Sequence, residues 1–152
     1  MTVEVEPARR ARRTRRLVDV RPDVKVVLAG LWVSMLFVFA YVDILGFWRG
    51  DVIRGALQGQ VPDSGPEINQ AFLALATAYV LVPSIMVAGS LLAPARINRP
   101  ANLLVSVVYL VSVLAAAVGE NWTYYILGSA AEAFLLVAIA GVAWRWPRQP
   151  RS

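Results

Sequence analysis

Four long apolar blocks constrain this chain more than any other feature of its sequence. They cover Val26–Trp48, Ala71–Ala93, Ala101–Gly119 and Thr123–Ala143, and each is 19 to 23 residues long. About 20 helical residues, each rising 1.5 Å, cross the roughly 30 Å hydrocarbon core of a bilayer. Helices of soluble bundles keep a polar face, which these blocks lack. The sequence therefore predicts four transmembrane helices rather than the buried helices of a soluble bundle.

The composition restricts the chemistry that such a protein can perform. The chain of 152 residues is 58% hydrophobic and 16% charged, and it has no Cys and no His. Disulfides, zinc sites of the usual Cys/His kind and His or Cys haem ligation are therefore excluded. Thiol nucleophiles and histidine acid–base catalysis are excluded as well. We expect a protein that is not an enzyme and that holds no metal and no cofactor.

Basic residues predict the orientation in the membrane. Eight Lys or Arg precede the first block, and the connection between the second and third blocks carries Arg96 and Arg99 without an acid. The C-terminal segment is also basic, whereas the other two connections are acidic or mixed. By the positive-inside rule both termini are cytoplasmic, and we expect a multi-pass protein of the bacterial plasma (inner) membrane. The first block begins too late and runs too long for a signal peptide, so we expect it to be retained.

The arginine-rich N-terminal segment has two interpretations. Arg12, Arg13, Arg15 and Arg16 are candidate contacts for anionic lipid headgroups, at about 1 kcal/mol per basic residue near the surface. Alternatively, the segment is a disordered tail that only sets topology. No aromatic residues are interleaved to stack bases, so nucleic acid is not an expected partner.

The predicted fold is an all-α membrane protein, an antiparallel four-transmembrane-helix bundle. Apolar spacing from Val52 to Leu57 favours a short outer interfacial helix between the first and second helices. We expect a transmembrane domain over residues 23–146, flanked by cytoplasmic tails 1–22 and 147–152. Its helices are expected at about 24–48, 65–93, 100–119 and 122–146.

Cap and turn residues predict the helix ends. Asp23 is expected to begin the first helix. Ser64 and Glu67 have capping-box spacing for the second, and Asn98-Arg-Pro100 is expected to restart the third. Asn121 or Thr123 is the expected cap of the fourth. Pro83 interrupts the second helix, where the hydroxyl of Ser84 is expected to help satisfy the freed carbonyl.

Polar residues within the apolar blocks are the candidates for function. Of ten acidic residues, only Asp43 and Glu132 lie within the blocks. Helical spacing aligns Asn102, Ser106 and Tyr109 on one face of the third helix. It likewise aligns Tyr125, Gly128 and Glu132 on the fourth helix, and Gln70, Thr77 and Ser84 on the second. Lipid offers no hydrogen bonds to these groups, so we expect all these faces to point into the bundle.

Glu132 is the most informative of these residues. It lies roughly 14 Å below the outer boundary, where an ionised carboxylate costs about 2.5–3.5 kcal/mol. One interpretation is a polar pocket, open to the outer side, that binds a cation, a proton or a small amphipathic ligand. Its candidate residues are Asp43, Gln70, Tyr79, Tyr109, Glu120, Asn121, Tyr125 and Glu132. In the other, Asp43 and Glu132 are protonated, or bonded to Tyr79, Tyr109 or backbone, and fix helix register.

Several motifs between Val24 and Trp146 are typical of one family. They are Leu31-Trp32, Tyr41-Val-Asp43-Ile-Leu, Val82-Pro83-Ser-Ile-Met86, Asn98-Arg99-Pro-Ala-Asn102, Tyr124-Tyr-Ile and Glu132. With them the chain resembles an uncharacterised family of small bacterial four-helix membrane proteins, loosely similar to DoxX-like proteins. The resemblance implies the four-helix fold and no particular activity.

Three functions remain open at this stage. The first is a non-enzymatic structural, accessory or small-ligand-binding protein with a polar pocket around Asp43 and Glu132. The second is a proton-coupled small-molecule transporter that uses Glu132. The third, by analogy with DoxX, is an accessory subunit of a quinone-linked membrane oxidoreductase. The expected partners are the lipid bilayer and either a second copy of the chain or another membrane protein.

Overall fold

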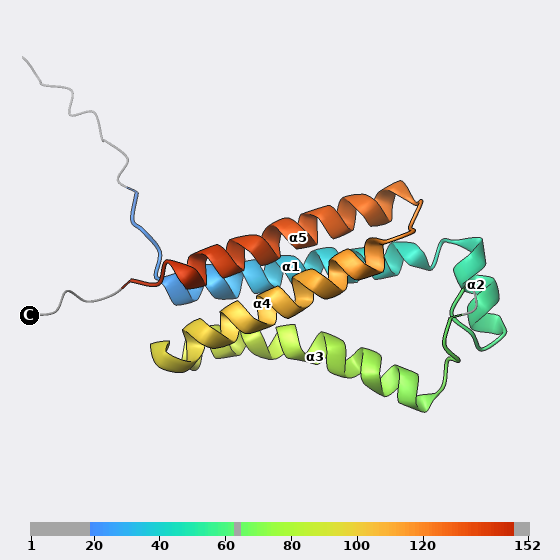
Figure 1. Ribbon diagram of the computed structural model, residues 1–152, viewed down its shortest axis with the longest axis horizontal. Coiled ribbons are helices and arrows are strands. Elements are labelled where there is room, and N and C mark those ends of the chain that lie inside the picture. The colour runs from blue at the N-terminus through green and yellow to red at the C-terminus, as the bar shows by residue number, and fades with distance from the viewer. Residues whose placement is uncertain (1–18, 63–64, 148–152) are drawn as a thin grey trace, which may run out of the picture.

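Five helices make up the protein in a computed structural model that describes residues 19–62 and 65–147. They are α1 (Val24–Gly46), α2 (Gly50–Leu57), α3 (Gln70–Leu92), α4 (Ala95–Ala117) and α5 (Thr123–Trp144), as Figure 1 shows. All except α2 are long and apolar enough to cross a membrane. The predicted all-helical bundle, with a short helix after its first long helix, is confirmed, and its four long apolar helices indicate a membrane protein.

The long helices form a ring of antiparallel neighbours. α1 packs against α3 and α5, and α4 packs against α5, while α3 and α4 touch over a shorter stretch. The start of α1, the turn from α3 to α4 and the end of α5 lie together at one end of the bundle (Figure 1). We call this the tail end. The opposite end, which carries α2 and the α4–α5 connection, is the α2 end.

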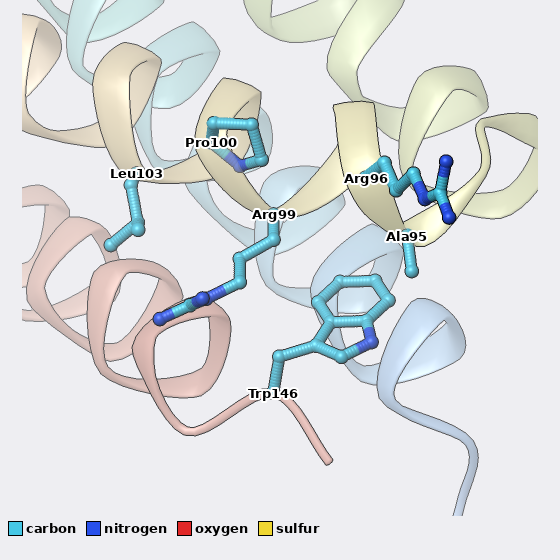
Figure 2. A pocket seen from close by; sticks show the side chains of 6 residues that line it. All are labelled: Ala95, Arg96, Arg99, Pro100, Leu103 and Trp146. Carbon is cyan, nitrogen blue, oxygen red and sulfur yellow. The ribbon is translucent and has the colours of Figure 1, made fainter. Parts of the chain in front are cut away.

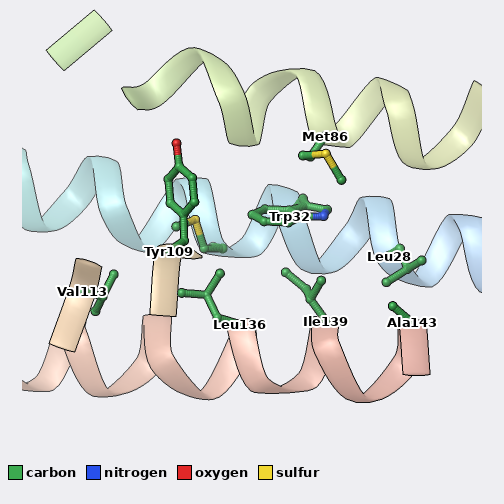
Figure 3. Packing of buried hydrophobic residues seen from close by; sticks show 9 residues of the cluster. Leu28, Trp32, Met86, Tyr109, Val113, Leu136, Ile139 and Ala143 are labelled. Atoms are coloured by element: carbon green, nitrogen blue, oxygen red, sulfur yellow. The ribbon is translucent and has the colours of Figure 1, made fainter. Parts of the chain in front are cut away.

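The apolar core fills the half of the bundle nearest the tail end. Leu28, Trp32, Leu136 and Ile139 have no exposed surface and pack between α1 and α5. Figure 3 shows Met86 of α3 reaching towards the indole of Trp32 from the other side. α1, α3 and α5 therefore meet around the indole of Trp32. α4 contributes Tyr109 and Val113 to the same core.

Only the second half of α3 is buried in the bundle. Its buried residues are Pro83, Met86 and Ser90, and no residue from 70 to 82 is buried. In Figure 1 the first half of α3 diverges from the other helices towards the α2 end. The bundle is therefore closed at the tail end and splayed at the α2 end.

The orientation predicted for α3 is wrong. Gln70, Thr77 and Ser84 were expected to face the interior, but all three are exposed. The hydroxyls of Thr77 and Ser84 donate to the carbonyls of Leu73 and Val80 at 2.8 Å, four residues earlier in the same helix. A hydroxyl satisfied in this way needs no partner from another helix, so it does not determine which face turns inward.

Three predicted helix starts also differ from the structure. α3 begins at Gln70 because Asn69 caps it, accepting a hydrogen bond from the Phe72 amide at 3.0 Å. Ser64 of the predicted capping box lies outside the described residues. α4 begins at Ala95 rather than near residue 100, since Pro94 is its N-cap. Asn98 is already helical, and its side-chain amide donates to the Ser90 carbonyl at 2.6 Å, which holds the turn.

The start of α5 is the third difference. Its N-cap is Trp122, which makes no side-chain cap hydrogen bond. Instead, the carboxylate of Glu120 accepts hydrogen bonds from the amides of Asn121 and Trp122 at 2.9 and 3.2 Å. The start of α1 is as predicted, because Asp23 caps it by accepting from the Lys25 amide at 2.8 Å.

Candidate functional site

A cavity of about 500 Å³ opens in the splayed half of the bundle, and all four long helices line it. It exists because the first half of α3 leans away from α4 and α5 while the core closes the other half. Its polar lining consists of Asp43, Tyr79, Ser112, Tyr125, Ser129 and Glu132. Its apolar lining consists of Phe39, Val42, Phe72, Val113 and Ala116. We call this space the ligand cavity.

Glu132 is the buried carboxylate of the ligand cavity. Only 4% of its surface is exposed, and its Oε1 has no hydrogen-bond partner among the described residues. Ser129 and Tyr125 precede it on the same face of α5, one and two turns earlier. A buried polar atom without a partner costs about 1–3 kcal/mol, and a charged one costs more. Glu132 lines the cavity, so a molecule held there would lie beside this carboxylate.

Asp43 is the exposed carboxylate of the same cavity. It lies in the last turn of α1, near the α2 end, and its side chain is accessible. Glu132 lies nine residues into α5, roughly 14 Å along its axis by helical rise. The lining residues include no Lys and no Arg. The cavity therefore runs from an accessible acid to a buried one, and its charge suits a cation.

The two tyrosine hydroxyls that were candidate partners of Glu132 are engaged elsewhere. The hydroxyl of Tyr79 lies 2.6 Å from that of Ser112. The hydroxyl of Tyr109 donates to the main-chain carbonyl of Tyr79. Pro83, four residues after Tyr79, leaves that carbonyl without a helical donor. Tyr109, and not Ser84 as predicted, satisfies it.

Aromatic rings connect the ligand cavity with the core. Phe39 and Tyr79 lie 5.7 Å apart between ring centroids, and Tyr79 and Tyr109 lie 4.7 Å apart. Tyr109 in turn meets Trp32 edge to face at 6.4 Å. Tyr109 itself does not line the cavity but supports Tyr79, which does. The wall of the cavity is therefore a packed aromatic surface.

Other predicted site residues lie outside the ligand cavity. Gln70 is the exposed first residue of α3. Glu120 and Asn121 line a neighbouring pocket with Arg49, which lies between α1 and α2, and Ala116 lies between this pocket and the cavity. Arg12, Arg13, Arg15 and Arg16 lie outside the described residues. The structure thus gathers Asp43, Tyr79, Tyr125 and Glu132 in one place, and it separates them from Gln70, Glu120 and Asn121.

The pocket at Arg49 contains ion pairs that join the α1–α2 connection to the α4–α5 connection, and we call these ion pairs the clamp. Arg49 pairs with Asp51 at 2.6 Å and with Glu120 at 2.9 Å, and its guanidinium lies 4.8 Å from the ring centroid of Trp122. The hydrogen bond from Arg49 lowers the pKa of Asp51 to about 2. Burial works to raise the pKa of Glu120, but hydrogen bonds from Arg49 and from two backbone amides outweigh it and lower the pKa.

A buried polar network near the tail end was not predicted as a unit. Asn102 accepts a hydrogen bond from the indole of Trp32 at 2.7 Å and from the hydroxyl of Ser90 at 3.2 Å. Its amide donates to the side chain of Asn98 at 2.7 Å. These side chains come from α1, α3 and α4. The i, i+4 spacing of Asn98 and Asn102 in the sequence could have predicted that the two side chains meet. It could not have predicted their partners on other helices, Trp32 and Ser90.

One comparison with known proteins identifies a family. The model of a family of unknown function, DUF6326, matches residues 16–150. Neither a curated protein nor a solved structure matches the chain significantly. The predicted resemblance to an uncharacterised family is confirmed, while the likeness to DoxX proteins and the bacterial origin stay predictions.

Proposed function

The chain belongs to DUF6326, a family of unknown function, and we propose that it is a non-enzymatic membrane protein that binds a small amphipathic cation in the ligand cavity. We place it in the plasma membrane with both termini in the cytoplasm and α2 on the outer surface, as the basic residues predict. The observation that carries the proposal is the buried Glu132 carboxylate in an acidic cavity, whose Oε1 has no hydrogen-bond partner in residues 19–62 and 65–147.

The chemistry of the wall supports a cation with an apolar body. Phe39, Phe72, Tyr79 and Tyr125 contribute aromatic groups, and aromatic faces attract cations by about 0.5–2 kcal/mol. Ligand cavities typically enclose about 300–1,000 Å³, are mostly apolar, and contain a few polar groups that fix orientation. A cavity of about 500 Å³ with two carboxylates matches this description.

Binding is favoured over transport by the packing beyond Glu132. Towards the tail end the interior is filled by Trp32, Leu136 and Ile139, none of which is exposed. A proton-coupled transporter would have to move these side chains to open a second exit. Transport with Glu132 as the proton carrier is therefore the second candidate.

The proposal is tested with tetraphenylphosphonium and the smaller benzyltrimethylammonium as probes. Their binding to the full chain in detergent micelles is measured by isothermal titration calorimetry. Leaving a buried charge without its partner costs about 2–5 kcal/mol, so we expect Glu132→Gln to weaken binding roughly 30-fold or more. Asp43→Asn is expected to have a smaller effect, because Asp43 is accessible to water. Glu67→Gln, an exposed acid outside the cavity, is the matched control.

Equal affinity of the parent protein and Glu132→Gln for both probes would contradict the proposal. Transport is tested separately by proton flux into liposomes that contain the protein. Flux at or below the leak of empty liposomes, in the parent protein and in Glu132→Gln alike, would exclude the transporter and leave binding.

A further inference from the structure

Another pocket, of about 540 Å³, lies at the tail end of the bundle, where α4 begins and α5 has just ended. Ala95, Arg96, Arg99, Pro100 and Leu103 of α4 line it together with Trp146 (Figure 2). It shares no lining residue with the ligand cavity. Its lining combines two guanidinium groups with apolar side chains and an indole, and it includes no carboxylate.

Arg99 is held in position at this pocket. Its Nε and Nη2 donate to the carbonyls of Ala143 and Trp144 at 3.3 and 3.4 Å, and its guanidinium lies 5.9 Å from the ring centroid of Trp144. A guanidinium has five N–H donors, so Arg99 retains donors for a further acceptor. Arg96, one turn earlier, is exposed and makes no ion pair within the described part of the chain.

We propose that this pocket binds the phosphate-bearing headgroup of an anionic phospholipid, with the lipid chains lying along Pro100 and Leu103. Arg96 is the second residue of α4 and Trp146 follows the last residue of α5 by two, so the pocket lies at the depth of the headgroups. Indoles favour this depth, and arginine binds phosphate through paired N–H donors. Exposed apolar side chains of α4, among them Leu104, Val107 and Val111, continue beyond the pocket, where a lipid chain would follow.

The tails of the chain itself do not complement the pocket. Residues 148–152, which continue from Pro147, contain Arg148 and Arg151 and no acidic side chain. The first 18 residues carry six arginines and two glutamates. Both segments are net basic, as is the pocket, so charge complementarity favours an anion from the membrane.

The test measures, by native mass spectrometry, how much lipid the full chain retains when it is released from detergent micelles. Phosphatidylglycerol and phosphatidylcholine are titrated separately, and we expect the first to be retained at lower concentration. A basic residue near an anionic surface contributes about 1 kcal/mol, which corresponds to roughly fivefold in affinity. We therefore expect phosphatidylglycerol affinity to fall about fivefold in Arg96→Gln and about 25-fold when Arg99→Gln is added.

Matched variants distinguish this pocket from general charge attraction. Replacing both arginines by lysine keeps the charge but removes the paired N–H donors and the guanidinium contacts of Arg99, so we expect phosphatidylglycerol affinity to fall although the charge is unchanged. Arg145→Gln, an exposed arginine at the same end that does not line the pocket, is expected to retain parent affinity. Arg96→Gln alone leaves the contacts of Arg99 intact. This single variant therefore tests the proposal even if the double variant is unstable.

Three outcomes would overturn the proposal. They are equal retention of the two lipids, a loss in Arg145→Gln as large as in the double variant, and displacement of phosphatidylglycerol by equimolar inorganic phosphate. The last outcome would identify a site for a soluble anion instead of a lipid.

Discussion

The hydroxyl of Tyr109 in α4 donates a hydrogen bond to the main-chain carbonyl of Tyr79 in α3. This is the carbonyl that Pro83 leaves without a helical donor, because proline has no N–H. The same bond joins α3 to α4, two helices that otherwise touch over a short stretch. It lies at the point where α3 begins to diverge, and it holds Tyr79 against the wall of the ligand cavity.

We predict that Tyr109→Phe destabilises the protein, because it leaves the Tyr79 carbonyl unsatisfied in a water-poor interior. The expected loss is about 0.6 kcal/mol, the average for interhelical hydrogen bonds in membranes, and at most about 1.7 kcal/mol. Chemical unfolding in mixed micelles, followed by circular dichroism, measures it. Tyr41→Phe is the control, since Tyr41 is 62% exposed.

Pro83→Ala provides a stricter form of this experiment. Alanine restores the N–H that can bond the Tyr79 carbonyl, so Tyr109→Phe should cost less in the Pro83→Ala background. An equal cost in both backgrounds would show that the role of Tyr109 is packing alone.

A second prediction concerns the contact between α1 and α5. A Cβ added at Gly128 would overlap Cγ2 of Val42, a stiff β-branched side chain that lines the ligand cavity. We expect Gly128→Ala to lower the free energy of unfolding by about 1–3 kcal/mol, the usual cost of overpacking. Gly141→Ala, in the same helix, is the matched control because its added Cβ meets nothing within 4 Å. Comparable losses in the two variants would refute the close contact.

A third prediction concerns the buried network around Asn102. Asn102→Leu keeps the approximate volume but leaves the indole N–H of Trp32 without its acceptor. It also removes the amide that donates to Asn98. We expect a loss of about 1–3 kcal/mol in unfolding free energy, with altered tryptophan fluorescence in the folded state. Thr77→Val is the control, because Thr77 is exposed and its hydroxyl donates to the Leu73 carbonyl of its own helix. A loss no larger than that of Thr77→Val would contradict a stabilising network.

The clamp at Arg49 predicts a dependence of stability on pH. Folding lowers the pKa of Asp51 from 3.8 to about 2 and also lowers that of Glu120 from 4.5. A carboxyl with a depressed folded pKa stabilises the protein above its unfolded pKa. That contribution is lost as the pH falls from about 4.5 to about 2.

Arg49→Gln tests this prediction. At pH 7 we expect its melting temperature to be lower by about 2–4 °C, since such pairs are largely screened by solvent. The difference from the parent protein should shrink as the pH falls to about 2. Thermal melts in micelles across this range measure it, and a difference that stays constant with pH would rule out the carboxyl partners. Arg54→Gln is the control, because Arg54 donates to the Gly50 carbonyl of its own helix and makes no ion pair in the described part of the chain.

Much of the architecture follows from local properties of the sequence. Hydropathy and length alone determined the four spans, because crossing a bilayer depends on the composition of each segment by itself. The apolar spacing of the first connection likewise predicted α2. The inward faces of α4 and α5 followed from Asn102, Tyr109 and Glu132, whose polar groups have no partner in lipid.

The ligand cavity depended on contacts that no single segment encodes. Sequence reasoning selected Asp43, Tyr79, Tyr125 and Glu132 together with Gln70, Glu120 and Asn121, and only the tertiary structure separated the two groups. It decided the tilt of α3, because Thr77 and Ser84 satisfy their own hydroxyls and leave its rotation undetermined. The hydrogen bond from Tyr109 to the carbonyl of Tyr79, which joins α3 to α4, connects residues 30 positions apart in sequence. The sequence by itself thus determined what lies in the membrane, and packing between distant side chains decided where the bundle opens.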